Sequence, residues 1–502
     1  MSIEHWRGGY LPSLISLEGD DQPLGNVTWH TLNFSVKGCE LSVEVPVLNQ
    51  DQMLAVAQHI KAQAKQVLQT LTVNEIIHLI DLAVARLLDS RDPIRREMDR
   101  LLPIVTGFDP EQVRLGLTAY LQAFRGPQLH RFVAEDFANP KVLDCFQPAV
   151  KGGAVRAYGP QLLAHLWAGN VPGLPMWSLV CGLLVKAGNI GKLPSSEPVF
   201  ASLFAKLLCE IYPPLKDCLA VVWWKGDQAQ GSNSAAGTLY RQAEVVLAYG
   251  GSAAMEEIRS QVPASTRLLC FGHKLGLAMI GKSALDRQKG PATARLLAMD
   301  MARWEQQGCY CPHSVYVERG AAFSPQAFAQ HLAAELANLE TRFVRRALNL
   351  TEAAALAAWR QAAEWRAIDS PEVQFLANEA SSWAIAVHEQ PQPLAPTSGY
   401  RCITVSAVNS LDEVLACITP HAAFLQTVGL ATTPSELYSL ADALGRVGVT
   451  RIAPIGAMAQ PEAGWHHDGR FNLIDLVRMV EIDQAAELAA DRLATYAEDK
   501  AL

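Results

Sequence analysis

The sequence lacks the features that would connect it with nucleic acid, export or a membrane. No cluster of Lys and Arg stands out from a formal net charge of −8, which excludes an extended surface for phosphate backbones. The first residues lack the charged-then-apolar order of a secretory signal, and this predicts a cytoplasmic protein. The longest nearly apolar stretch, 171–185, contains two prolines and two glycines and is shorter than the roughly 20 residues of a spanning helix.

Charge is also scarce, at 18% of the 502 residues, whereas half of the residues are hydrophobic. This composition is typical of a globular protein, and the length predicts two or three domains. Ten cysteines are scattered between Cys39 and Cys417. Because nothing indicates export, we expect reduced thiols and no disulfide framework.

Short apolar runs alternate with helical periodicity in the first half of the chain. Strands are predicted at 163–167, 189–193, 219–224, 245–249 and 267–271. Apolar residues at three- and four-residue spacing from Val199 to Ile211 predict a helix that packs on a sheet. Strands and helices that alternate in this way predict right-handed crossovers and a doubly wound parallel sheet.

A second alternating region begins after Lys274. Helices are expected at 325–339, 351–365, 411–418 and 436–445, a strand at 427–431, and a polar break at 390–398. Before the first region, the pattern predicts a strand at 41–47 and a helix at 73–88.

The stretch around Cys309 carries the clearest chemical signal. Gly308 precedes Cys309, and a glycine lets the backbone bring a thiol close to a substrate carbonyl. Cys309 is therefore a candidate nucleophile, although a buried structural cysteine is the commoner fate of this residue type. Cys309, Cys311 and His313 also have a spacing found in zinc sites, but no clear fourth ligand accompanies them. We therefore expect no metal.

Five further motifs occur around this segment in a fixed order. They contain Asn170 (167–172), Lys192 (191–197), Gly250 (248–252), Cys270 (270–274) and His467 (465–469). Each motif is weak alone, but together with Cys309 they resemble the aldehyde dehydrogenase superfamily in order and spacing. The resemblance extends over about residues 10–483. It is closest to the LuxC-type acyl-CoA reductases, the fatty acid reductases of bacterial bioluminescence and their relatives.

The resemblance implies an oxyanion site and a phosphate-binding turn. Asn170 is implied to donate its side-chain N–H to the oxyanion, a contribution that is large in other enzymes. Gly250, Gly251 and Ser252 are implied to present backbone N–H groups to a pyrophosphate or nicotinamide, at a helix N-terminus that favours anions.

The resemblance also implies an adenine-ribose site. Lys192 would meet the ribose hydroxyls or a 2′-phosphate. Ser195 stands where NAD-preferring relatives carry an acid, so NADPH is expected as the cofactor, with NADH as the alternative. The turn is one residue longer than the common form, and Glu197 is the alternative acid.

Two other motifs bear on the reaction. Cys270 occupies the place of the glutamate that activates water in aldehyde-oxidising members. A thiol is a poor general base for water, so an acyl-enzyme would wait for hydride, which favours thioester reduction. His467 is a candidate for proton delivery, and a structural pair with Asp468 is the alternative.

The predicted fold is α/β and aldehyde dehydrogenase-like. It comprises a β-rich segment (1–75), an NAD(P)-binding domain (76–273), a catalytic domain (274–452) and a C-terminal segment (453–502) that returns to the nucleotide-binding domain. The resemblance implies a small β oligomerisation element, assembled from the early residues and the C-terminal segment, and a homodimer or homotetramer.

The predicted reaction is reduction of a fatty acyl thioester to the aldehyde through a covalent acyl-cysteine. The acyl donor would be acyl-CoA or an acylated partner protein. Two alternatives stay open: a cysteine-dependent acyltransferase or thioesterase without nicotinamide, and a non-catalytic structural subunit.

Overall fold

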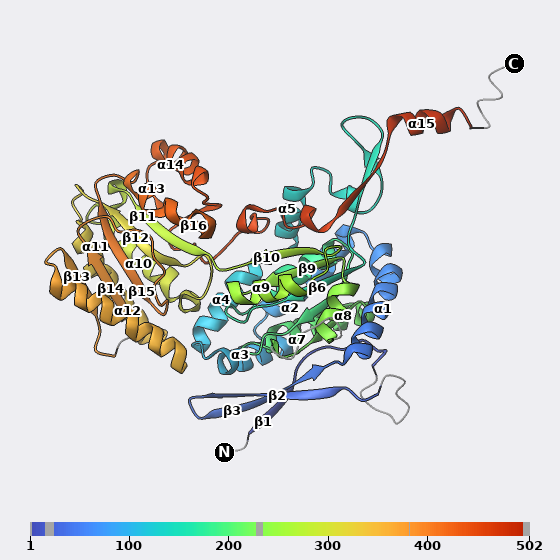
Figure 1. The fold of residues 1–502 in the computed structure, drawn as a ribbon, viewed down its shortest axis with the longest axis horizontal. Helices are drawn as coiled ribbons and strands as arrows, with labels where there is room; N and C mark the ends of the chain where they lie inside the picture. The colour runs from blue at the N-terminus through green and yellow to red at the C-terminus, as the bar shows by residue number, and fades with distance from the viewer. Residues whose placement is uncertain (1–2, 16–24, 227–233, 381, 495–502) are drawn as a thin grey trace.

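The computed structural model describes residues 3–15, 25–226, 234–380 and 382–494. They form two α/β lobes that lie side by side, each built on a largely or wholly parallel sheet (Figure 1). Two smaller sheets extend from opposite ends of the first lobe. None of the described helices is long and apolar enough to cross a bilayer.

The first lobe contains a five-stranded parallel sheet in the order β10-β9-β6-β7-β8. Its strands are β6 (Leu162–Leu166), β7 (Gly188–Lys192), β8 (Leu219–Val222), β9 (Val245–Tyr249) and β10 (Arg267–Phe271). Its helices are α1 (Gln50–Val67), α2 (Val73–Leu88), α3 (Pro93–Thr106), α4 (Pro110–Gln122), α5 (Gly126–Asp136), α6 (Leu174–Leu184), α7 (Val199–Ile211), α8 (Ala235–Gln242) and α9 (Ser252–Gln261). All five predicted strands are thus confirmed.

Burial on both faces explains why this sheet is doubly wound. Leu163 packs in the core beneath α2, α6 and α7, whereas its neighbours Leu162 and Ala164 pack beneath α1 and α8. Successive side chains of a strand point to opposite faces, so a strand covered by helices on both sides must be apolar throughout. The apolar stripe predicted on α7 is buried as expected from Val199 to Leu208.

The second lobe has a seven-stranded sheet in the order β13-β14-β15-β12-β11-β16-β17, parallel except for β13. Its strands are β11 (Leu275–Ile280), β12 (Pro312–Glu318), β13 (Val373–Ala377), β14 (Ala384–His388), β15 (Cys402–Val408), β16 (Leu425–Ala431) and β17 (Arg451–Pro454). Its helices are α10 (Lys289–Ala302), α11 (Pro325–Arg342), α12 (Leu350–Asp369), α13 (Glu413–Ile418) and α14 (Pro434–Arg446). The helices and the strand predicted after Lys274 all occur here.

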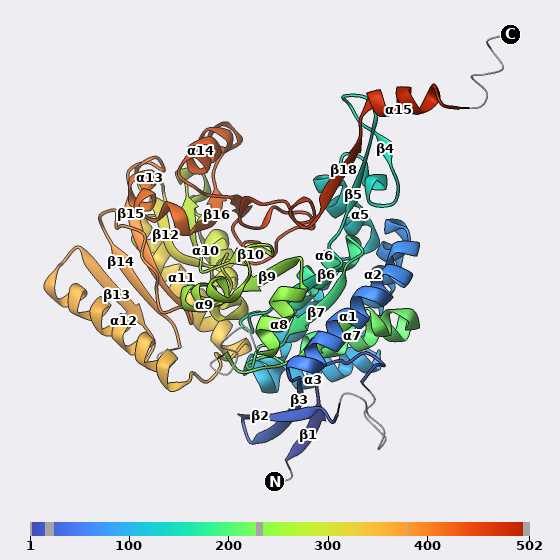
Figure 2. The same ribbon diagram turned by 45° about the vertical axis from the view of Figure 1, so that its right-hand side comes forward.

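The two small sheets correct the predicted oligomerisation element. The early strands β1 (Glu4–Arg7), β2 (Thr28–Val36) and β3 (Cys39–Val47) form one sheet. The C-terminal strand β18 (Arg478–Ile482) instead pairs with β5 (Ala154–Tyr158), which also pairs with β4 (Gln147–Pro148). Within the described ranges, early and C-terminal residues therefore do not share a sheet. Figure 2 shows β4, β5 and β18 in one arm that continues into α15 (Gln484–Asp491).

The first 75 residues are also less β-rich than predicted. Residues 50–67 form α1, which begins with a capping box between Asn49 and Gln52. The apolar face of α1, including Met53, Val56 and Ile60, packs on the five-stranded sheet. Amphipathic spacing and an N-cap are local signals of a helix. The prediction of a β-rich segment at 1–75 did not take them into account.

Candidate active site

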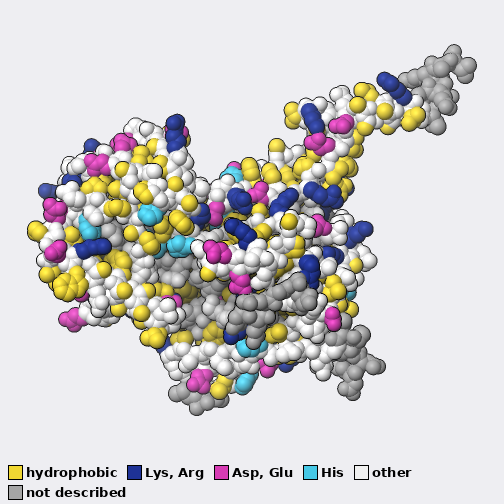
Figure 3. Space-filling view, viewed as in Figure 1, with side chains coloured by type: hydrophobic (Ala, Val, Ile, Leu, Met, Phe, Trp, Pro, Cys, Tyr) yellow, Lys and Arg dark blue, Asp and Glu magenta, His cyan; other side chains and the backbone are white. Residues whose placement is uncertain are grey.

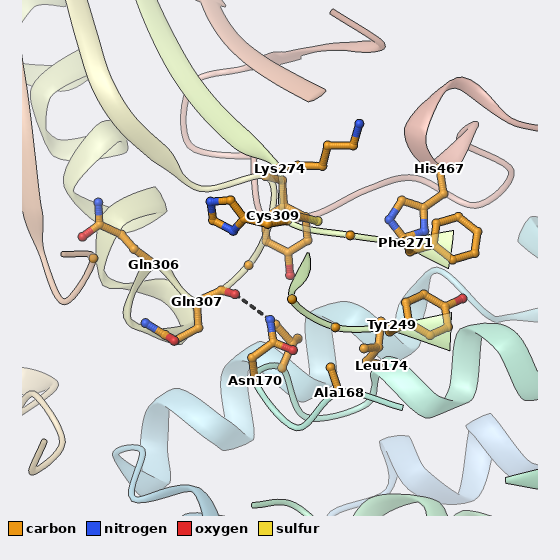
Figure 4. A pocket seen from close by; sticks show the side chains of 18 of the residues that line it. Ala168, Asn170, Leu174, Tyr249, Phe271, Lys274, Gln306, Gln307, Cys309 and His467 are labelled. Carbon is orange, nitrogen blue, oxygen red and sulfur yellow. Dashed lines mark hydrogen bonds between the residues drawn. The ribbon is translucent and has the colours of Figure 1, made fainter. Parts of the chain in front are cut away.

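A cavity of about 480 Å³ lies between the two lobes and gathers most of the predicted site residues. Asn170, Cys309 and His467 line it (Figure 4). Gly250 and Gly251 line it as well. Three predicted cofactor residues do not line this cavity: Lys192, Ser195 and Ser252. Motifs that are up to 297 residues apart in the chain are thus brought to one place by the fold.

The position of the cavity follows from the topology of the first sheet. The chain runs outward from β6 through β7 to β8 and then crosses back to β9 on the other side of β6. In open α/β sheets, ligands bind outside the carboxyl ends of the strands where the order reverses. The loop with Asn170 follows β6, and Gly250 and Gly251 follow β9, so both lie at this reversal point.

The loop before Cys309 has an unusual backbone. Trp304, Glu305 and Gln306 have φ values of 49°, 50° and 59°, a left-handed conformation that costs free energy in residues other than glycine. A fully buried ion pair holds the loop, because Arg401 donates to both carboxylate oxygens of Glu305 at 2.9 and 3.1 Å. The strained backbone of this loop is therefore stabilised by contacts from a distant segment.

The Gln306 side chain ties both ends of the same loop. Its Nε2 donates to the carbonyls of Pro312 at 2.8 Å and Cys402 at 3.1 Å, and its Oε1 accepts from the Cys402 N–H at 3.0 Å. Every polar atom of this buried amide side chain is thereby satisfied. The backbone that carries Cys309 is fixed between β12 and β15.

Asn170 lies opposite this loop. Its Nδ2 donates to the carbonyl of Gln307 at 2.6 Å (Figure 4). An amide nitrogen carries two hydrogens, so one N–H remains for a substrate oxygen in the cavity.

Burial governs the ionisation of the cysteines here. Burial raises the pKa of the Cys309 thiol to about 11, opposed by a hydrogen bond from the Gln426 amide. That bond spans 3.3 Å from Nε2 to Sγ. Cys311 is fully buried, and burial raises its pKa well above the usual range. Among the described residues, no three His, Cys, Asp or Glu side chains are arranged to hold a metal ion.

His467 belongs to an aromatic wall of the cavity. Its ring stacks on Phe271 with centroids 4.5 Å apart and lies 4.9 Å from the Trp465 ring. Burial lowers the pKa of His467 to about 4, with Asp468 acting in the opposite direction. The imidazole is therefore neutral at neutral pH.

Cys270 is not where the sequence comparison placed it. Its side chain lines a separate cavity with Arg259 and Arg470 and packs on the opposite side of β10 from the catalytic cavity. Phe271 faces the catalytic cavity in its place. Successive side chains of a strand point to opposite faces, so Cys270 and Phe271 of β10 face different sides of the sheet. The prediction that Cys270 stands in the place of a catalytic glutamate was thus wrong.

Glu197 is likewise not at a ribose-facing position. It is 1% exposed, and its Oε1 accepts from the N–H groups of Val199 and Phe200 at 2.8 Å each. These contacts satisfy the free N–H groups at the start of α7. Burial raises the pKa of this carboxyl to about 8, against those two hydrogen bonds.

The turn after β9 fits a dinucleotide phosphate. Gly251 is the N-cap of α9 and makes no side-chain cap hydrogen bond to the first N–H groups of that helix. A Cβ placed on Gly251 would enter open space, so a ligand can approach the backbone closely. Lys192 ends β7, the neighbour of β6 in the sheet. Ser195 Oγ accepts from the Trp223 indole N–H at 3.0 Å.

Sequence reasoning missed several residues of the site, some of which line the cavity and one of which contacts Cys309 from outside the lining. Gln426 contacts Cys309 from a position 117 residues away, and Tyr120 and Trp177 line the cavity from α4 and α6. No motif marks Gln426. The apolar residues look like ordinary core positions of helices, so only the tertiary structure identifies them.

Comparison with known proteins gives one family and one fold. The family model described as acyl-CoA reductase (LuxC) matches residues 68–479. The long-chain acyl-protein thioester reductase 2 of Photobacterium leiognathi is 23% identical over 470 residues, 91% of each chain. The corresponding reductase of Photorhabdus luminescens is 24% identical over 472 residues, 91% of this chain and 90% of the relative.

The solved structures that are similar to this chain include aldehyde dehydrogenases. One is a mutant of the indole-3-acetaldehyde dehydrogenase AldA of P. syringae in complex with NAD⁺ and IAA, with a TM-score of 0.72, 12% identity and coverage of 96% and 97% of the two chains. Another is lactaldehyde dehydrogenase from Escherichia coli, with a TM-score of 0.67, 14% identity and coverage of 96% and 100%. The predicted aldehyde dehydrogenase-like fold is confirmed.

Proposed function

The chain belongs to the acyl-CoA reductase (LuxC) family, and on that premise we propose that it reduces a fatty acyl thioester to the aldehyde with a nicotinamide cofactor. The observation that carries this proposal is one cavity lined by Cys309, Asn170 and the Gly250–Gly251 turn. A nucleophile, an oxyanion donor and a turn that fits a dinucleotide are the parts that a two-stage covalent reduction needs.

In the first stage, the Cys309 thiolate attacks the thioester carbonyl. The second N–H of Asn170 and the backbone N–H of Cys309 stabilise the oxyanion, and the thiol of the donor leaves. A nicotinamide cofactor, when bound, supplies the hydride that reduces the acyl-cysteine. The resulting thiohemiacetal collapses to aldehyde and free Cys309. His467 is proposed to relay a proton as a neutral imidazole, in which one ring N–H donates while the other ring nitrogen accepts a proton from water.

The cavity offers an apolar wall for the acyl chain. Its apolar and aromatic side chains include Tyr120, Leu174, Trp177, Tyr249, Phe271 and Trp465. Burial of each methylene of a fatty acyl chain against such a wall contributes about 0.8 kcal/mol. A long acyl group, carried by CoA or by an acylated protein, is therefore the proposed substrate.

The direct test is a steady-state assay with long-chain acyl-CoA and NADPH or NADH. We expect aldehyde formation coupled to oxidation of the cofactor. Formation of free acid, or acyl transfer, without cofactor oxidation would support a thioesterase or acyltransferase. No acylation of the protein by either acyl-CoA or an acyl-protein would support a structural subunit.

The same assay tests cofactor preference. We expect NADPH to have the higher kcat/KM, because Ser195 replaces the acid that would repel a 2′-phosphate. Lys192→Met should lower kcat/KM with NADPH about tenfold, and less with NADH. Burial lowers the pKa of Lys192, with Glu257 acting in the opposite direction. A preference for NADH would instead indicate that Glu257 accepts from the ribose.

The acyl-enzyme should persist when cofactor is absent. No Asp or Glu occurs among the described residues that line the catalytic cavity, so water there lacks a carboxylate base. Cys270→Glu should leave the decay rate of acyl-Cys309 unchanged, since the new carboxylate would face Arg259 and Arg470 in the separate cavity. Quenched-flow measurement of acyl-enzyme decay tests both statements. Faster hydrolysis in Cys270→Glu would mean that this side chain reaches the catalytic cavity.

The arm is the proposed site of self-association. Apolar side chains remain exposed along it, namely Val150, Met479, Leu488 and Leu493, and Figure 3 shows such side chains on the arm. Helix α15 has no buried residue. A second copy that covers these side chains would form the proposed homodimer or homotetramer.

A further inference from the structure

We propose that Gln426 and Asp468 form a positioning pair that holds the Cys309 thiol and stabilises its thiolate. The pair gives Asp468, the neighbour of His467, a role at the thiol. The inference rests on the proposed role of Cys309 as the nucleophile, and its test does not require reductase activity.

The contacts of the Gln426 amide carry the proposal. The side chain is 1% exposed, and its Nε2 donates to Cys309 Sγ at 3.3 Å and to Asp468 Oδ1 at 2.5 Å. The two hydrogens of one nitrogen are thus directed at a sulfur and a carboxylate.

The orientation of this amide is determined by its neighbours. An ionised carboxylate only accepts hydrogen bonds, so Asp468 requires the nitrogen of Gln426 on its side. The Thr427 hydroxyl donates to Gln426 Oε1 at 3.3 Å, which holds the oxygen on the other side. With the amide fixed in this way, Cys309 meets a donor and not an acceptor.

The strand geometry places Gln426 at the site. Leu275 and Leu277 of β11 pair with Leu425 and Val428 of β16, so β16 has one extra residue at this point. Such a bulge redirects side chains and commonly occurs beside active sites. A regular pairing of β11 with β16 would leave no extra residue in β16 at this point.

The loop that carries Asp468 is anchored to the first lobe. Asp468 has a φ of 55°, a conformation that needs support from its surroundings. The Leu473 N–H donates to Asp136 Oδ2 at 2.5 Å, and the Trp177 indole N–H donates to Asn472 Oδ1 at 3.1 Å. The carboxylate therefore reaches Gln426 from a fixed loop.

The chemical effect concerns the charge on sulfur. A hydrogen-bond donor favours the charged form of an acid, so the Gln426 N–H opposes the rise in the Cys309 pKa that burial causes. Sulfur becomes negative twice in the proposed reaction. It is negative before attack, and again when the thiohemiacetal oxyanion reforms a carbonyl and the electron pair of the broken C–S bond returns to Sγ.

Alkylation of Cys309 by iodoacetamide tests the pair without thioester or cofactor. The rate is followed from pH 6 to pH 10 by mass spectrometry of the Cys309 peptide, in wild type and in Gln426→Met. Loss of the donor should slow alkylation about tenfold below the thiol pKa and shift the profile about one unit upward. Gln374→Met, the same change at an exposed position on the edge strand β13, is the control and should match wild type.

A double-mutant cycle tests the contribution of Asp468. Asp468→Ala should slow alkylation several-fold when Gln426 is present, because the Gln426 amide loses its anchor. In the Gln426→Met background the same change should accelerate alkylation, since only direct repulsion between carboxylate and thiolate is then removed. Equal effects in the two backgrounds would overturn the pair.

The outcomes separate the pair from the proposed function. An unchanged alkylation profile in Gln426→Met overturns the pair, even if wild type forms aldehyde. A shifted profile in a protein that thioesters do not acylate supports the pair and overturns the function. If Gln426→Met does not fold, Gln426→Leu also removes the donor and should slow alkylation to a similar extent.

Discussion

Replacement of Cys309 with alanine should abolish covalent acylation and lower aldehyde formation at least about ten-thousandfold, because the group that forms the intermediate is removed. Cys309 lines the cavity between the lobes, next to the Asn170–Gln307 contact. The measurement is mass spectrometry of protein incubated with acyl-CoA, together with the rate of cofactor oxidation.

Cys311→Ala is the matched control. Cys311 is two residues away, fully buried, and absent from the cavity lining, so acylation and aldehyde formation should be retained at least in part. An acyl group mapped to Cys311 in wild type would transfer the nucleophile role to that residue. Acylation that persists in Cys309→Ala at another residue would contradict the two-stage mechanism at Cys309.

Replacement of Asn170 with alanine should lower kcat/KM for the thioester about 100- to 1000-fold, the range found when one oxyanion donor is removed. The change removes both N–H groups of the amide, including the bond to Gln307 at 2.6 Å. Steady-state rates and the rate of acyl-enzyme formation measure the loss.

Alkylation separates the two roles of Asn170. Attack of Cys309 on iodoacetamide forms no oxyanion, so an oxyanion donor can be removed without slowing it. Asn170→Ala should therefore alkylate at the wild-type rate. A parallel loss of alkylation and acylation would show that Asn170 acts by holding the Gln307 backbone, and the oxyanion role would be withdrawn.

Much of the fold could be predicted because the signals are local. The five strands of the first sheet and helix α7 occur where apolar runs and three- to four-residue spacing predict them. Helix α2 likewise begins at the Thr72–Glu75 capping box. Such features depend on neighbours within one turn or one strand.

The placement of Cys309 and Asn170 at one cavity could also be predicted, because each lies in a short motif beside a strand end. Asn170 follows β6, and Cys309 precedes β12. The turn with Gly250 and Gly251 follows β9 in the same way. In parallel sheets the carboxyl ends of neighbouring strands share one edge, which brings the segments of Asn170 and Gly250 together. Cys309 lies before β12 in the other sheet, and the packing of the two lobes brings it to them.

Two site assignments made from the sequence were contradicted by the tertiary structure. Cys270 and Phe271 are adjacent, and the side of β10 that faces Cys309 is set by how that strand sits in the sheet. Glu197 is close to Lys192 in sequence, but its carboxylate caps α7 in the interior. A motif match gives position along the chain and not the direction of a side chain.

The sequence by itself determined the order of strands and helices, the family resemblance, and the segments that meet at the cavity. Only the tertiary structure decided which side chains of those segments touch Cys309. Gln426 reaches the thiol through an extra residue in β16, and Arg401 stabilises the left-handed loop through a buried pair with Glu305. Strand register, bulges and contacts between distant segments depend on the whole packed chain, and no local pattern of residues specifies them.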